Sequence, residues 1–216
     1  MKSLCKKAIA FLVLGVMMFS FFGCNKEVKI AENERTYKSI GKFTKYEVKD
    51  TKGMKLFETD RYKIYFTKDS KLWKENENGK IYYDKTADCM FTMENAEKAP
   101  DSLNELSEKQ KLELKKRYNL DPDSGYEGLQ LHYTLLSEDT RKKDAIAREL
   151  YDKNKEIVME KEVLAFDNGK VKGFVCWWGN MYMVYFFSED ETKFFKSLIR
   201  ADDDIVCTIV NTFEFK

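Results

Sequence analysis

Near the carboxyl end, two apolar segments meet at a Gly-Asn pair, and this feature limits what the chain can fold into. The segments read FVCWW and MYMVYFF, on either side of Gly179-Asn180. A Gly-Asn pair supplies the positive φ angles of a tight two-residue hairpin turn. Such a turn sets Trp178 opposite Met181, and the remaining pairs follow from that register. Because both faces of the hairpin are apolar, we expect it to lie centrally in a sheet with helices covering it.

Further turn signals predict that this sheet is antiparallel. Asn78-Gly79 separates KLWKE from KIYYD, and Asn168-Gly169 separates EVLAFD from KVKGFV. Lys52-Gly53 separates KFTKYEVKD from MKLFETDRYKIYF. Repeated short turns between apolar segments are typical of hairpins, and hairpins join antiparallel strands.

Two helices are predicted in the middle of the chain. The first begins at a cap formed by Asp101 or Ser102 and ends near Tyr118. Its apolar residues for burial are Leu103, Leu106, Leu112 and Leu114. The second runs from about Ser137 to Asn154. Its apolar stripe consists of Ile146, Ala147, Leu150 and Tyr151.

Two more helices are predicted near the carboxyl end. The segment 188–191 resembles a capping box and predicts a helix through Ile199. Asp202 or Asp203 is expected to cap a last helix, whose apolar residues recur at helical spacing. We therefore expect an α+β fold: a single domain, mainly an antiparallel sheet with several hairpins, flanked by helices.

The amino terminus has the pattern of an export signal. Lys2, Lys6 and Lys7 form a basic region, and an apolar run extends from Ala8 to Phe22. This run is shorter than the roughly 20 apolar residues of a membrane-spanning helix. A basic start, a short apolar stretch and a small residue before a cut are typical of a signal peptide.

The end of this run, Phe21-Phe22-Gly23-Cys24, resembles the lipobox of bacterial lipoproteins. Gly23 and Cys24 match that pattern, whereas leucine and a small residue usually stand where this chain has Phe21 and Phe22. The resemblance implies a lipoprotein signal peptide at 1–23 and diacylglycerol on the Cys24 sulfur. It implies a lipidated tether at 24–38 and a globular domain at 39–216. The alternatives are an ordinary secretory signal with an incidental cysteine, or an uncleaved anchor.

The lipobox also implies a location in the cell envelope. Two or three acyl chains hold a protein stably at a membrane, where one chain does not. Asn25 resembles the outer-membrane sorting class of some bacteria, so we expect the outer membrane or the cell surface rather than the inner membrane. The expected membrane contact is the lipid on Cys24.

The element order of residues 40–216 resembles the PsbP-like fold. The matching features are the Tyr62–Phe66 strand, Trp73, the hairpins and helices, and a closing helix followed by Thr212-Phe-Glu-Phe215. This fold is an antiparallel sheet flanked by helices, found among exported and membrane-associated accessory proteins. Members often act as binding or assembly factors, so the resemblance implies a non-enzymatic role, although fold alone does not transmit function.

Charge and cysteine content limit the partners and cofactors. The chain has 38 Lys and Arg against 37 Asp and Glu, and loss of three signal-peptide lysines takes the net charge from +1 to −2. A balance so close to neutral argues against nucleic acid as a partner. Beyond Cys24 lie Cys89, Cys176 and Cys207. Either Cys176 pairs with Cys207, or all three are buried thiols. Without a CxxC or a Cys/His cluster, we expect no cofactor and no structural zinc.

Three groups of residues are candidate sites. Trp177, Trp178 and Tyr182, with Trp73 and Tyr185, are candidates for an aromatic groove that binds a ligand, although aromatics on paired strands are more often core. Asp121, Asp123 and Glu127 form a weak calcium candidate, because they surround a glycine at near-alternate positions. His132 is the only histidine, and with a cysteine or serine nucleophile it would serve an envelope hydrolase. Asp202–Asp204 are interpreted as a helix cap rather than a cation site.

The leading hypothesis is therefore a non-enzymatic lipoprotein whose domain binds a protein or small ligand at the cell envelope. The alternative is an envelope hydrolase that uses His132 with a cysteine or serine nucleophile.

Overall fold

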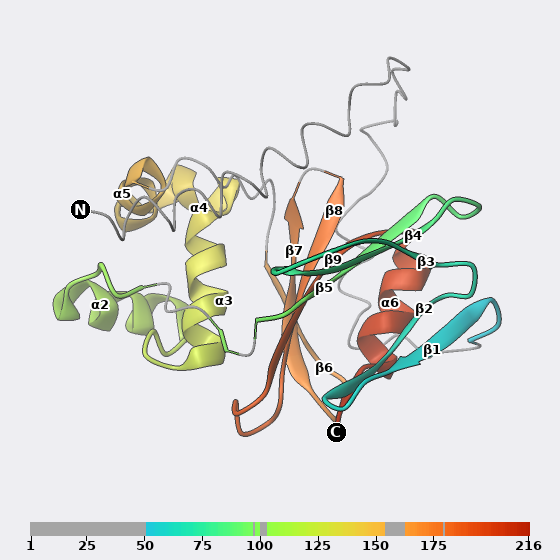
Figure 1. The fold of residues 1–216 in the computed structure, drawn as a ribbon. Coiled ribbons are helices and arrows are strands. Elements are labelled where there is room, and N and C mark those ends of the chain that lie inside the picture. The colour runs from blue at the N-terminus through green and yellow to red at the C-terminus, as the bar shows by residue number, and fades with distance from the viewer. Residues whose placement is uncertain (1–50, 97, 100–102, 154–162, 179) are drawn as a thin grey trace, which may run out of the picture. The chain divides into compact units, whose positions relative to one another are not determined.

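A computed structural model describes residues 51–216, apart from 97, 100–102, 154–162 and 179 (Figure 1). Seven strands form one antiparallel sheet, in the order β3-β4-β5-β9-β8-β7-β6. They are β3 (Lys71–Asn76), β4 (Gly79–Asp84), β5 (Cys89–Glu94), β6 (Leu164–Asp167), β7 (Lys172–Trp178), β8 (Met181–Phe187) and β9 (Phe194–Arg200). Three more strands form a second sheet in the order β1-β2-β10. These are β1 (Met54–Glu58), β2 (Tyr62–Thr67) and β10 (Glu214–Phe215).

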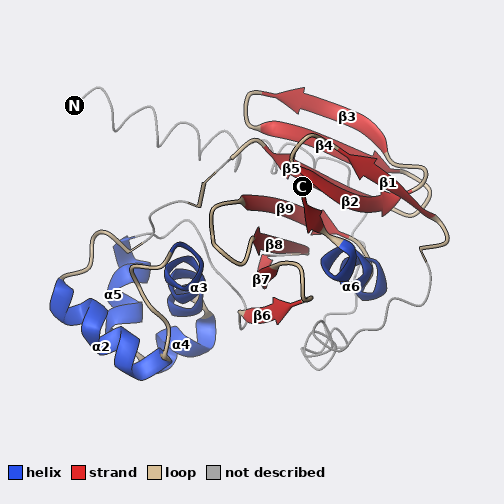
Figure 2. Cartoon of the chain, turned by 90° about the horizontal axis from the view of Figure 1, so that it is seen from below, coloured by secondary structure: helices blue, strands red, loops and turns tan. Residues whose placement is uncertain are grey.

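Helices accompany these sheets, which confirms the expected α+β class with antiparallel pairing. The described helices are α2 (Glu108–Tyr118), α3 (Gly125–Leu136), α4 (Glu138–Lys143), α5 (Ala145–Lys153) and α6 (Asp203–Thr212). Helices α2 to α5 lie together between β5 and β6 in the chain and on one side of the strands, with α6 apart from them (Figure 2). Among the described residues, no helix is long and apolar enough to cross a membrane.

The apolar hairpin at Gly179-Asn180 has the predicted register and position. Trp178 pairs with Met181, and the pairing continues to Lys172 and Phe187 at the other end. All seven residues of β8 are buried, and β8 lies between β7 and β9 inside the sheet. The two-faced apolar pattern therefore did identify an internal strand pair.

The other turn signals are confirmed with one addition. Glu77-Asn78 joins β3 to β4, one residue earlier than predicted, with Gly79 as the first residue of β4, and residues 168–171 join β6 to β7. Lys52-Gly53 forms a turn before β1, with φ of +87° at Gly53. The strand expected before that turn lies outside the described residues. A further hairpin turn at Thr59–Arg61, which we had not predicted, separates β1 from β2.

The helix predicted from the capping box at 188–191 is wrong, because this segment is a turn followed by strand β9. Ser188 Oγ accepts a hydrogen bond from the Lys193 backbone N–H at 2.9 Å, which closes the turn. The residues that follow pair with β8 over the full length of β9 and with β5 at its end. Phe194 and Phe195 are both buried there. Strand pairing on both sides outweighs a local capping pattern.

The first predicted helix begins later than its expected cap. Ser107, rather than Asp101 or Ser102, caps α2, and Gln110 completes a capping box with it. Residues 101 and 102 lie outside the described part of the chain. Three of the four leucines are buried as expected, but Leu112 is 55% exposed because it lies on the outer face of α2.

The second predicted helix is two helices, and one further helix was missed. Ser137 caps α4 as expected, but the chain is extended at Asp144, where α5 begins. Helix α3 occupies residues that the sequence pattern indicates as a turn and as chain without an assigned element. Ser124 caps this helix, and the Ser124 Oγ accepts a hydrogen bond from the Glu127 N–H at 3.0 Å. Leu129, Leu131, Leu135 and Leu136 make α3 the most buried helix of this group.

The two faces of the large sheet are covered differently (Figure 1). On one face lie α6 and the small sheet. The last helix is confirmed, and Asp202 occupies its N-cap position without a side-chain capping hydrogen bond. Phe213, directly after α6, stacks on Phe186 and Phe195, with ring centroids at 4.0 and 5.2 Å. On the other face, α3 packs through Tyr133 against Tyr185 at 5.1 Å. The core thus has an aromatic layer on each side of β7 and β8.

Candidate functional site

Strand β5 shows that part of the sheet has one closed face and one partly open face. Its side chains alternate between buried and half-buried: Cys89, Phe91 and Met93 are buried, whereas Met90, Thr92 and Glu94 are half-buried. The register places Met90 between Tyr83 of β4 and Arg200 of β9, and these two are also half-buried. Met90, Tyr83 and Arg200 lie on the same face of the sheet as the residues of β7 and β8 that α3 covers. Helix α3 therefore covers only part of this face.

The edge strand β3 adds two large exposed apolar side chains at the edge of the sheet: Trp73 lies beside Tyr83 on the open face, whereas Leu72 is paired with Tyr82, whose ring packs on the small-sheet face. Leu72 is 50% exposed and Trp73 is 48% exposed. The pairing with β4 shifts between Leu72 and Lys74, so Trp73 occupies a β-bulge. The Trp73 and Tyr83 rings lie 6.3 Å apart. Edge strands carry bulges where backbone pairing is to be avoided, so this edge presents side chains rather than a free strand.

Three polar and aromatic groups next to Trp73 are fixed by one another. Asp88 Oδ1 accepts hydrogen bonds from the Tyr83 hydroxyl at 2.9 Å and from Arg200 Nη2 at 2.8 Å. The Arg200 guanidinium lies 6.0 Å from the Tyr83 ring centre. The hydrogen bond to Asp88 raises the pKa of the Tyr83 hydroxyl, with a smaller contribution from burial. Tyr83 therefore stays a neutral hydrogen-bond donor at physiological pH.

We call Leu72, Trp73, Tyr83, Asp88 and Arg200 the Trp73 surface. Asp88, in the turn between β4 and β5, has φ of +49°. Trp, Tyr and Arg are the residue types that contribute most to binding energy at macromolecular interfaces. Rings and charges that are fixed before binding lose little conformational entropy on contact. This surface is therefore the candidate functional site.

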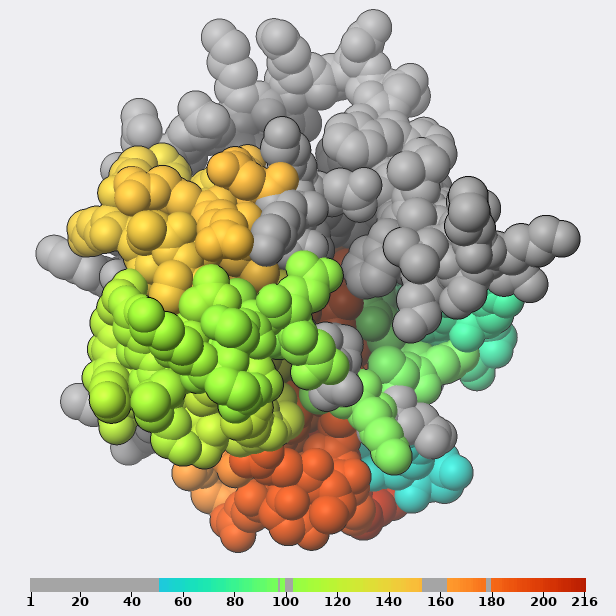
Figure 3. Space-filling model, turned by 90° about the vertical axis from the view of Figure 1, so that its left-hand side faces the viewer, coloured from blue at the N-terminus to red at the C-terminus, as the bar shows by residue number. Residues whose placement is uncertain are grey.

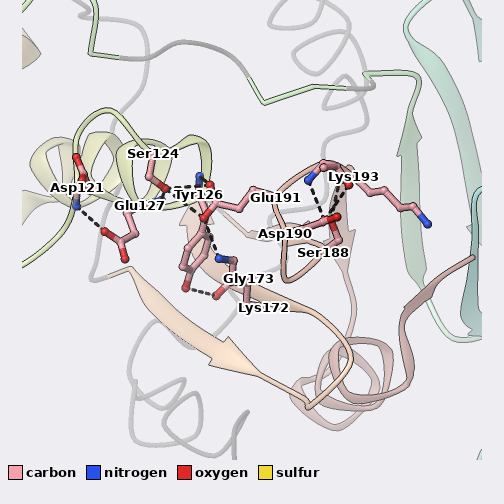
Figure 4. Close-up of polar contacts among 11 residues, drawn as sticks. Asp121, Ser124, Tyr126, Glu127, Lys172, Gly173, Ser188, Asp190, Glu191 and Lys193 are labelled. Atoms are coloured by element: carbon pink, nitrogen blue, oxygen red, sulfur yellow. Dashed lines mark hydrogen bonds and ion pairs between the residues drawn. The ribbon is translucent and has the colours of Figure 1, made fainter.

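A second polar cluster joins the helices to the sheet (Figure 4). Glu191, on the turn between β8 and β9, accepts from Ser124 Oγ at 3.0 Å and from Lys172 Nζ at 2.8 Å. It also accepts from the Tyr126 N–H, and the Tyr126 hydroxyl donates to the Gly173 carbonyl at 3.2 Å. In the view of Figure 3 the turn lies beside α3, which it contacts through Tyr126. A carboxylate at the first turn of a helix compensates the helix dipole, so this cluster holds α3 on the sheet.

The calcium candidate does not form a ligand set. Asp121 pairs with Lys115 at 2.5 Å, and Asp123 pairs with Lys111 at 2.8 Å. Glu127 accepts instead from the Asp121 backbone N–H at 2.6 Å. Within the described residues, no group of three or more His, Cys, Asp or Glu side chains could hold a metal. These carboxylates serve the turn before α3 and the contact between α2 and that turn.

Three of the five aromatic groove candidates are core residues. Trp177 is 8% exposed and Tyr182 is 1% exposed, and their rings meet edge to face at 4.5 Å. Tyr185 is also buried, where its hydroxyl donates to Tyr133 at 2.6 Å. The backbone of Trp178 belongs to β7, but its side chain lies outside the described part of the structure. Of the five aromatic candidates, Trp73 is the one that the structure shows exposed to solvent.

The thiols do not have the properties of nucleophiles. Cys89, Cys176 and Cys207 are buried and free, which agrees with the second of the two alternatives, three buried thiols, and not with pairing of Cys176 with Cys207. Burial raises the pKa of Cys89 to about 11 and that of Cys176 further above its usual value. A catalytic thiol needs a lowered pKa and access to substrate.

His132 is on α3, which packs against β7, the strand that carries Cys176. The His132 ring lies edge-on to Tyr133, with centroids at 5.3 Å. Proximity to Cys176 would not supply an activated nucleophile there, because that thiol is buried with a raised pKa. Asp203 of the acidic triplet lies at the first turn of α6 and contacts the Tyr182 hydroxyl. Cys24 lies outside the described residues.

Sequence reasoning did not identify Tyr83, Asp88 and Arg200. The available signal was the segment KIYYD, in which polar and apolar residues alternate before a turn. Such alternation indicates a strand with one outward face. Nothing in one strand reveals that Arg200 of β9 lies beside it.

Comparisons of the chain with protein-family models, with curated proteins and with solved structures gave no match.

Proposed function

We propose that this chain is a non-enzymatic binding module of the cell envelope, held at a membrane by lipid on Cys24. The module docks on an extended partner through the Trp73 surface. The observation that carries this proposal is the pair of half-exposed side chains, Leu72 and Trp73, beside the fixed group of Tyr83, Asp88 and Arg200.

An extended partner fits this surface better than an enclosed small ligand. The aromatic residues that would line a groove, Trp177 and Tyr182, are instead packed in the core. The exposed rings and charges lie across β3, β4 and β9, on an open sheet face and its edge. Small-molecule sites are concave and surround most of the ligand. The resemblance to the PsbP-like fold, whose members often act as binding or assembly factors, supports the same class of function.

The alternative, an envelope hydrolase that uses His132, receives less support. A cysteine nucleophile is disfavoured by the burial and raised pKa of Cys89 and Cys176. A serine nucleophile would have to contact the His132 ring directly. If an ester-hydrolysis assay on the purified full chain gave activity that His132→Ala abolished, the non-enzymatic proposal would be wrong.

The lipid anchor is tested by intact mass and by fractionation. We expect a mature chain that begins at Cys24, carries acyl chains and sediments with membranes. Cys24→Ser should accumulate as unprocessed precursor or be released in soluble form. Parental processing and membrane fractionation in the Cys24→Ser chain would contradict the anchor.

The docking surface is tested by oxidative footprinting of the full chain. We expect Trp73 and Tyr83 to be protected in native membranes relative to the detergent-purified chain. Leu112, which is 55% exposed on α2, is the matched reference side chain. Equal oxidation of Trp73 in both preparations, with Leu112 unchanged, would contradict a docking role for this surface.

A further inference from the structure

We propose that the partner of the Trp73 surface is an anionic phospholipid bilayer, on which the domain lies with β3 against the headgroups. This inference rests on the proposed function, because it names the partner of the same surface.

The first observation is an uneven distribution of charge along the chain. Residues 51–85, which form β1 to β4, contain nine Lys and Arg against six Asp and Glu, a net charge of +3. Residues 86–216 contain 19 against 26, a net charge of −7. An anionic surface attracts the first part and repels the second. The nearly neutral total therefore conceals a charge distribution that would orient the domain.

The second observation is the position of basic side chains around Trp73. Lys71 is exposed at the start of β3, and the register places it opposite Tyr83. Lys85 is exposed two residues after Tyr83, and Lys68 is exposed in the turn that leads into β3. Asp69 and Glu75 are also exposed there, and Glu75 is paired with Lys80. Lysines that flank an exposed tryptophan and leucine are suited to a headgroup region. The charges contact lipid phosphates while the apolar side chains enter the interface.

The third observation is the position of this surface relative to the anchor along the chain. The described chain begins at Thr51, directly before β1, so β1 to β4 are the described elements closest in sequence to Cys24. The acidic remainder follows them. A lipid anchor and a basic surface are two membrane signals that reinforce each other.

A bilayer also fits the geometry of the edge strand. The bulge at Trp73 disfavours the addition of a partner strand to β3. A fluid interface needs no backbone pairing and accepts Leu72 and Trp73 individually. A protein partner would instead need a shape complementary to the whole Trp73 surface.

The test is fluorescence quenching of the full chain reconstituted in vesicles. The vesicles contain brominated phosphatidylcholine, either alone or mixed with phosphatidylglycerol. In a Trp178→Phe background, we expect phosphatidylglycerol to increase bromine quenching of tryptophan, and Trp73→Phe to remove that increase, because Trp177 is buried in the core. Each lysine near an anionic surface strengthens the contact about fivefold. Lys68→Gln with Lys71→Gln should therefore reduce the quenching strongly.

The matched control is Lys109→Gln with Lys116→Gln, two exposed lysines of α2, which should leave the quenching unchanged. Equal quenching with and without phosphatidylglycerol, or in the parent and Trp73→Phe, would overturn this inference. Protection of Trp73 in native membranes without quenching in these vesicles would also overturn it, in favour of a protein partner, and would leave the proposed function intact. Release of the chain from all vesicles would contradict the lipid anchor. The released chain would then be mixed with phosphatidylglycerol vesicles, and absence of tryptophan quenching there would overturn the inference.

Discussion

The carboxylate of Glu191 accepts a hydrogen bond from the backbone N–H of Tyr126 at 3.0 Å, which joins the turn between β8 and β9 to the first turn of α3. Glu191 has φ of +58°, so the turn holds this side chain in an uncommon backbone conformation. Lys172 binds the same carboxylate and lies 4.9 Å from the centre of the Tyr126 ring. One residue thus connects a turn, a helix and strand β7.

Replacement of Glu191 should loosen this connection. Glu191→Ala removes hydrogen bonds from Ser124, Tyr126 and Lys172, and we expect the free energy of unfolding to fall by about 2 kcal/mol. Urea denaturation of the full chain in detergent measures the change. Glu189→Ala, an exposed carboxylate in the same turn, should change stability little. An equal effect of the two substitutions would show that Glu191 does not hold α3.

The same carboxylate should give stability a pH dependence. Burial alone would raise the pKa of Glu191, but hydrogen bonds from Lys172, Tyr126 and Ser124 lower it below its usual 4.5. A lowered pKa means that this stabilisation is fully present above the unfolded pKa and is lost as the pH falls through the folded one. The difference in unfolding free energy between the parent and Glu191→Gln should therefore shrink in acid. A difference that is constant with pH would contradict this.

Asp144 should be the most sensitive residue of the helical region. Its carboxylate is 3% exposed, contacts Arg117, accepts from the Tyr118 hydroxyl at 2.7 Å and caps α5 through the Ile146 N–H at 2.9 Å. We expect Asp144→Ala to cost about 2 kcal/mol, because the cap and the charge partner are both lost. Asp144→Ser retains a capping hydroxyl and should cost less. Thermal denaturation of the two variants compares them, and identical losses would exclude a contribution from the cap.

The three cysteines should react with thiol reagents only after unfolding. Cys89, Cys176 and Cys207 are buried, and burial raises the pKa of the first two thiols. We expect iodoacetamide to leave all three unmodified in the native chain and to alkylate all three in urea, as read by peptide mass spectrometry. Reductant should not change the melting temperature. Rapid native alkylation of Cys176 would revive the cysteine hydrolase as an alternative.

Two glycines at predicted hairpin turns should differ in their tolerance of a side chain. Gly79 has φ of +145°, and a Cβ there would lie 2.1 Å from the Met93 carbonyl oxygen. Gly169 has φ of +78° but no atom within 4 Å of a Cβ. Gly169→Ala should therefore cost about 1 kcal/mol from backbone strain alone. Gly79→Ala should cost clearly more, because β4 and β5 must separate. Equal losses in denaturant titrations would contradict the close approach of these strands.

Local patterns predicted those elements whose neighbours in space are also neighbours in sequence. The register from Trp178 and Met181 is one example, because a two-residue turn leaves a single pairing possible. Helix α6 is another, since its apolar spacing and acidic first turn are contained in one segment. The failures have the opposite character. Segment 188–199 begins with a pattern typical of a helix start, but it forms strand β9 because β8 and β5 pair with it.

The sequence by itself determined the α+β class, the central hairpin and the signal that predicts a lipid on Cys24, because each depends on a short segment and its own chemistry. Only the tertiary structure decided which aromatic residues are buried and which are exposed. Trp177 and Trp73 both stand on predicted hairpin strands, yet one lies in the core and the other is half exposed at the sheet edge. The strand order, which places β3 at the edge and β8 inside, accounts for the difference. That order arises from burial of apolar area summed over many distant residues, so no local pattern contains it.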